Sequence, residues 1–124
     1  MKRIAVWNTA FLGDAVLTLP LLQSLRLRYP EAVLDYYVRG GLVSLFSSHP
    51  AISSVYAYDK RGGEKGLSAF FRLGRELAGR NYDLWISAHG SLRSSLLALA
   101  SRAPMRIGYR QAVLGRLCCT HLVD

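Results

Sequence analysis

Hydrophobic positions along the chain fall into short runs that alternate with longer ones. The short runs are rich in β-branched and aromatic residues and are apolar on successive positions, which is typical of strands covered on both faces. The longer runs have helical spacing. Strands are expected near residues 3–7, 33–38, 54–58, 82–88 and 105–108, with helices near 14–29, 42–47, 66–80 and 91–100.

Alternating strands and helices of these lengths imply parallel pairing through right-handed crossovers. The pattern therefore predicts an α/β fold: a three-layer, Rossmann-like domain with a parallel sheet of about five strands and helices on both faces. Ligands of such sheets bind outside the carboxyl ends of the strands. The loop from Asn8 to Gly13, which follows the first strand, is expected at that edge.

Asp14 comes at the start of the first helix and fits two roles. A carboxylate there can simply accept orphan backbone N–H groups and suit the helix dipole. It can also be a reactive group at the ligand-binding edge. Further along the same run, Pro20 is expected to kink the helix or to follow a short first turn, with Thr18 as the capping residue.

Cations come after two later strands of the predicted sheet. Lys60 and Arg61 lie in a glycine-containing loop after the third strand, and Arg93 lies in the first turn of the helix after the fourth. A mobile basic loop and a guanidinium at that edge could hold a carboxylate or phosphate. The alternatives are a solvated surface loop and an exposed arginine.

The segment from Phe11 to Pro20, Phe-Leu-Gly-Asp-Ala-Val-Leu-Thr-Leu-Pro, resembles the start of the lipopolysaccharide heptosyltransferases, which are inverting glycosyltransferases that use ADP-heptose. In that family a loop after the first strand ends in Gly-Asp, and the next helix carries Thr-x-Pro or a similar element. Four later elements follow in the order that the family shows: Tyr29-Pro30, Tyr82-Asp83, Ser91-Leu92-Arg93-Ser94 and Arg106-Ile107-Gly108-Tyr109. The resemblance covers almost the whole chain.

The resemblance implies two facing Rossmann-like domains, of which residues 1–124 would be the N-terminal, acceptor-binding one, with the C-terminal donor domain absent. Asp14 would be the general base. The residues implied to bind the acceptor are Asn8, Thr9, Gly13, Lys60, Arg61, Arg93 and Arg106. The donor ADP-heptose would bind mainly the other domain, so the chain alone is expected to be inactive and to need no cofactor or metal.

The absence of nucleotide-binding motifs agrees with a donor site in the other domain. The fingerprint Gly-x-Gly-x-x-Gly is missing after the first strand, and so is a phosphate loop that ends in Gly-Lys-Ser or Gly-Lys-Thr. Nucleotide binding within these residues is therefore not expected.

Composition adds a strong positive charge. With 16 Lys and Arg against 8 Asp and Glu, the net charge is +8, which indicates an anionic partner. The expected partners are an anionic lipid-linked sugar and the inner leaflet of a membrane, touched peripherally. The alternative is a non-enzymatic basic α/β module that binds nucleic acid or another polyanion, although the cations are scattered and lack an aromatic recognition motif.

Two further features bear on location. No apolar run approaches the ~20 residues that span a bilayer, and no export signal is recognised. The adjacent Cys118 and Cys119 have the wrong spacing for a redox or zinc pair and are expected to be reduced. A cytoplasmic protein of one globular domain is therefore expected, whose oligomeric state the sequence leaves open.

Overall fold

The computed structural model describes residues 2–8, 18–39, 42–58, 67–88, 92–109 and 119–123, with only the backbone for residues 39, 58, 67–70, 92–95, 109 and 122–123. In this part of the chain the strands are β1 (Arg3–Trp7), β2 (Val33–Arg39), β3 (Ser54–Tyr58), β4 (Leu84–Ser87), β5 (Met105–Tyr109) and β6 (His121–Val123). The helices are α2 (Leu19–Arg28), α3 (Val43–Phe46), α4 (Leu67–Gly79) and α5 (Leu92–Ala100).

One sheet contains all of these strands in the order β3-β2-β1-β4-β5-β6, and every neighbouring pair is parallel. The predicted α/β class, the parallel sheet and its first five strands are thus confirmed. The sixth strand, β6, was not predicted, because three residues carry too little pattern. It pairs with β5 beside Thr120, whose hydroxyl accepts from the Arg106 amide at 2.7 Å and donates to the Arg106 carbonyl at 3.0 Å.

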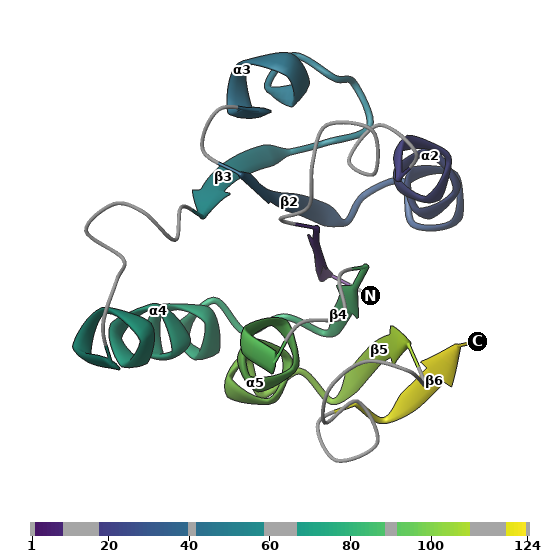
Figure 1. Ribbon diagram of the computed structural model, residues 1–124. Coiled ribbons are helices and arrows are strands. Elements are labelled where there is room, and N and C mark those ends of the chain that lie inside the picture. Colours follow the sequence, from purple (N-terminus) through teal and green to yellow (C-terminus); the bar gives the residue numbers. More distant parts are fainter. Residues whose placement is uncertain are drawn as a thin grey trace.

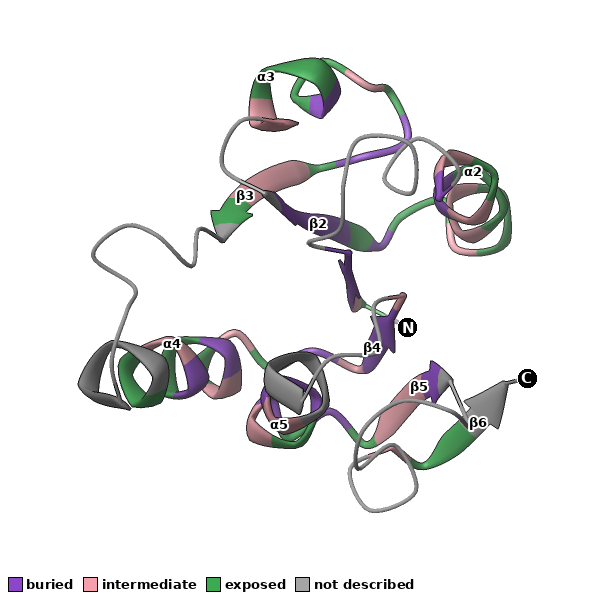
Figure 2. Ribbon diagram, viewed as in Figure 1, coloured by how far each residue is buried: buried purple, intermediate pink, exposed green. Residues whose placement is uncertain are grey.

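Helices cover both faces of the sheet. Figure 1 shows α2 and α3 on one side, and α4 and α5 on the other. Successive side chains of a strand point to opposite faces, so β1 contributes Ile4 and Val6 to the core under α2 and α3, and Ala5 and Trp7 to the core under α4 and α5. These four side chains are at most 1% exposed. Figure 2 accordingly shows the buried residues concentrated on β1, β2 and β4.

Helices α4 and α5 pack side by side through small residues. A Cβ added at Gly74 would lie 3.2 Å from the Cβ of Ala100, closer than side chains usually pack. After α4 the chain turns at Asn81, whose φ is +55°, a left-handed conformation that asparagine tolerates better than most residues. The chain then enters β4 through Tyr82.

A buried polar chain ties this turn to β2. The hydroxyl of Tyr82 donates to Oδ2 of Asp35 at 2.6 Å, and the hydroxyls of Tyr82 and Tyr37 are 2.6 Å apart. Because the Tyr82 proton is used on Asp35, Tyr37 must donate to Tyr82, and Arg80 in turn donates to Tyr37. Burial raises the pKa of both tyrosines, so they remain protonated donors. Arg3 completes the chain, 3.7 Å from the Asp35 carboxylate.

Removing the Tyr82 hydroxyl tests this chain. In Tyr82→Phe, Asp35 loses its short hydrogen bond and Tyr37 loses its acceptor, both in the core. We expect the free energy of unfolding to fall by about 1–3 kcal/mol, measured by urea denaturation. Tyr29→Phe removes a hydroxyl from a half-buried ring and should cost less than about 0.5 kcal/mol. Equal losses in the two variants would contradict the role given to the chain.

Candidate functional site

The sheet reverses its strand order at β1 and β4. From β1 the chain goes to β2 on one side, and β4 lies on the other side of β1. Open parallel sheets bind ligands at such a switch point, outside the carboxyl ends of the two strands. Here those ends are adjacent, because the Ala88 amide donates to the Trp7 carbonyl at 2.8 Å. The described chain therefore ends beside the switch point after both strands, at Asn8 and at Ala88.

Most predicted site residues follow strand ends at this edge. Thr9, Gly13, Asp14, Lys60 and Arg61 lie outside the described residues. By chain order, the first three come after β1 and the two cations come after β3. Arg93 is the second residue of α5, where only the backbone is described, and it follows β4. Their proposed roles remain predictions.

Asn8 is the predicted site residue whose surroundings are described at the switch point. It is only 2% exposed, and its amide Nδ2 donates to Oγ1 of Thr18 at 2.8 Å. Thr18 also hydrogen-bonds the hydroxyl of Tyr36 in β2. Burial raises the pKa of Tyr36 to about 12, and the Thr18 bond opposes part of that rise. Asn8 thus faces the protein interior, and its predicted contact with an acceptor has no support in this geometry.

The start of α2 explains why Thr18 is available for these bonds. Thr18 occupies the position before the helix, as predicted, but its side chain makes no capping hydrogen bond. The predicted cap is therefore wrong in its chemistry. Pro20 is the second helical residue, where a backbone N–H would have no partner in the helix, so the proline neither kinks nor breaks α2. No pattern in the sequence indicates Tyr36 as a hydrogen-bond partner of Thr18.

Arg106 lies elsewhere. It is the second residue of β5 and pairs in register with Trp85, two residues before the end of β4. Its guanidinium Nη1 donates to the carbonyl of Ala103 at 2.7 Å, which directs the side chain back towards the amino edge of the sheet. The structure does not bring Arg106 together with Asn8.

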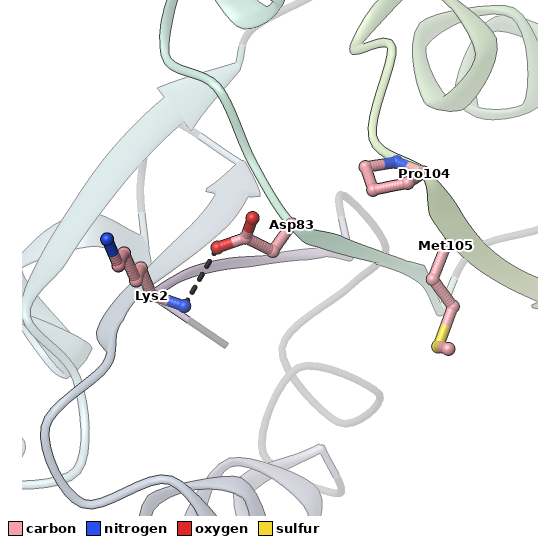
Figure 3. A pocket seen from close by; sticks show the side chains of 4 residues that line it. All are labelled: Lys2, Asp83, Pro104 and Met105. Atoms are coloured by element: carbon pink, nitrogen blue, oxygen red, sulfur yellow. Dashed lines mark hydrogen bonds between the residues drawn. The ribbon is translucent and has the colours of Figure 1, made fainter.

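The amino edge carries a pocket of about 550 Å³, opposite the switch point. Figure 3 shows described residues that line it: Lys2, Asp83, Pro104 and Met105. The Asp83 carboxylate accepts the backbone N–H groups of Lys2 at 2.8 Å and of Arg3 at 3.0 Å. These two bonds hold the pKa of Asp83 below its usual value. The carboxylate thus joins the starts of β1 and β4, which is a structural role.

The lowered pKa of Asp83 predicts a pH effect. A carboxyl whose pKa is lower in the folded state stabilises the fold above its unfolded pKa, near pH 4, and loses that contribution as the pH falls through the folded value. Asp83→Asn should therefore reduce the slope of the melting temperature against pH below about pH 4. Glu31→Gln, which removes an exposed carboxylate, is the control. A slope equal to that of the parent protein would contradict the assignment.

Two searches of the described residues bear on site chemistry. Within the described ranges, no three His, Cys, Asp or Glu side chains are grouped so that they could hold a metal ion. None of the helices in these ranges is long and apolar enough to cross a membrane.

The fold and the switch point define the class as a Rossmann-like α/β domain. Several solved structures share the fold. A glycosyl transferase family 9 protein from Veillonella parvula is similar with a TM-score of 0.89 and 30% identity, over 99% of this chain and 36% of that one. The Escherichia coli heptosyltransferase WaaC with ADP has a TM-score of 0.78 and 24% identity, over 98% of this chain and 40% of that one.

Sequence comparison gives the family. Residues 70–119 match the profile of glycosyltransferase family 9 (heptosyltransferase). The chain is also 29% identical to lipopolysaccharide heptosyltransferase 3 of Escherichia coli over 119 residues, which are 91% of this chain and 35% of that protein. The chain belongs to the heptosyltransferase family, as the resemblance predicted. It spans about a third of the length of the relatives that it matches.

Proposed function

We propose that this chain is the N-terminal, acceptor-binding part of a glycosyltransferase that transfers heptose from ADP-heptose to the lipopolysaccharide inner core, with inversion. The observation that carries the proposal is that this chain matches family 9 and that β1, which Gly13 and Asp14 follow in the sequence, ends at the switch point of the sheet. The names of the relatives supply the sugar and the acceptor class. The remaining two thirds of their length would supply the donor site.

In the proposed reaction Asp14 is the general base. Inversion requires the acceptor hydroxyl to attack the anomeric carbon opposite the departing ADP. A carboxylate within about 2.6–3.2 Å of that hydroxyl can take its proton as the new bond forms. Thr9 and Gly13 would line the same segment. The 124 residues alone would bind acceptor without turnover, because the leaving group has no site.

Lys60, Arg61 and Arg93 would bind the carboxylate and phosphate groups of the acceptor. They follow the carboxyl ends of β3 and β4, on the edge at which β1 ends ahead of Asp14 in the sequence. Arg106 is not part of this proposal, because its guanidinium is bonded to Ala103 towards the other edge. A lipid-linked acceptor would bring the protein to the cytoplasmic face of the membrane as a peripheral protein.

The base assignment predicts a selective loss of turnover. In a complete transferase that contains this chain, Asp14→Asn should lower kcat by about 10²-fold to 10⁴-fold, the range for loss of a general base, with acceptor affinity changed less than about threefold. Release of ADP and acceptor titration measure the two quantities. Glu31→Gln removes an exposed carboxylate and should change neither. A turnover in Asp14→Asn equal to that of the parent enzyme would refute the assignment.

Acceptor binding by the chain itself separates specific recognition from binding by net charge. Lys60→Glu with Arg61→Glu should weaken binding of a carboxylated, phosphorylated inner-core oligosaccharide at least about tenfold, since charge-assisted bonds are lost. The matched control, Arg72→Glu with Arg75→Glu, makes the same charge change at exposed positions of α4 and should weaken binding less than about threefold. Calorimetric titration measures both.

Two outcomes would contradict this proposal. Equal weakening in the two double variants would indicate diffuse polyanion binding. Salt-sensitive binding of arbitrary oligonucleotides, without preference for the core oligosaccharide, would favour the nucleic-acid module instead.

A further inference from the structure

Asn8 and Thr18 are the described residues on either side of residues 9–17, and their side chains are bonded to each other. The distance from Nδ2 of Asn8 to Oγ1 of Thr18 is 2.8 Å, with the two residues 2% and 8% exposed. The backbone amide of Asn8 also donates to the carbonyl of Tyr37 at 3.0 Å. The segment thus begins and ends at one buried hydrogen bond.

Thr18 is joined to β2 as well. Its hydroxyl oxygen accepts from Asn8, and the same hydroxyl is hydrogen-bonded to the hydroxyl of Tyr36. Tyr36 is 0% exposed, and its ring meets the ring of Phe46 edge to face at 5.4 Å. Because the Thr18 side chain makes these bonds, it does not cap the start of α2. Three elements, β1, α2 and β2, therefore meet at one hydroxyl.

We propose that Asn8 and Thr18 are positioning residues for glycosyl transfer: their hydrogen bond, completed by Tyr36, fixes both ends of the segment that carries Asp14. The proposal rests on the proposed function, in which Asp14 is the base, and it gives Asn8 a role other than acceptor contact. Fixing both ends limits the places that a nine-residue segment can reach. Precision matters because a misplacement of about 1 Å can cost about 10²-fold in rate.

The test uses Thr18→Val, which keeps the shape and removes the hydroxyl. In a complete transferase, kcat should fall at least about tenfold while KM for the acceptor changes less than about twofold, and Thr18→Ser should restore most of kcat. Ser101→Ala is the matched control, since it removes another buried hydroxyl, which donates to Ala98 at 2.6 Å far from the switch point. It should lower the melting temperature similarly and leave kcat unchanged.

A second measurement needs no activity. In the 124-residue chain, exchange of the Asn8 and Leu22 amides can be followed by NMR, because these amides donate to Tyr37 and Thr18 at the two ends of the segment. Thr18→Val should accelerate both at least about tenfold relative to Ser101→Ala. Unchanged exchange would overturn the proposal, and so would faster exchange with the kcat of the parent. A parent protein without transferase activity would overturn the proposed function, and the exchange rates would still show whether the bond holds the two ends.

Discussion

The fold depends on the central position of β1 in a wholly parallel sheet. β1 is hydrogen-bonded along both edges, to β2 and to β4, and its side chains from Ile4 to Trp7 are buried on both faces. A strand held in four directions cannot shift without breaking a ladder or opening a core. The point at which the chain leaves β1, after Asn8, is therefore fixed, and so is the origin of the segment that contains Asp14.

β2 connects two buried polar arrangements among the described residues. Tyr36 faces α2 and meets Thr18, whereas its neighbours Asp35 and Tyr37 face α4 and meet Tyr82. Burial raises the pKa of all three tyrosines, so their hydroxyls stay neutral across the physiological range and keep fixed roles as donors and acceptors. A neutral hydroxyl also avoids the large cost of a buried charge. The same strand thus braces the switch point on one face and the turn after α4 on the other.

The sequence was informative where physics is local or periodic. Apolar runs such as residues 3–7 and 84–87 specify strands buried on both faces, and parallel order follows from the crossovers, so the edge that carries the candidate site could be predicted. The hydrogen-bond partners of individual side chains could not be predicted in this way. Thr18 before a helix is as good a cap as it is a partner for Tyr36, and only the packed tertiary structure decides between them. For the same reason Arg106 was interpreted as a cation available to an acceptor, although its guanidinium donates to the carbonyl of Ala103.

Several of the arginines that contribute to the net charge of +8 have structural roles. Arg26 donates to the carbonyls of Ala32 and Ala51, at the starts of β2 and β3, and Arg106 donates to Ala103 before β5. Arg3, at the start of β1, lies 3.7 Å from the Asp35 carboxylate, and Arg80, ahead of β4, donates to the hydroxyl of Tyr37. The guanidiniums of Arg3, Arg26 and Arg106 thus bind groups near the beginnings of strands, whereas that of Arg80 binds Tyr37 in the later half of β2. They add to the long-range field, but a bound anion could not take them without losing structure. The selective recognition proposed above is therefore assigned to cations that follow the carboxyl ends, where chain order places Lys60, Arg61 and Arg93.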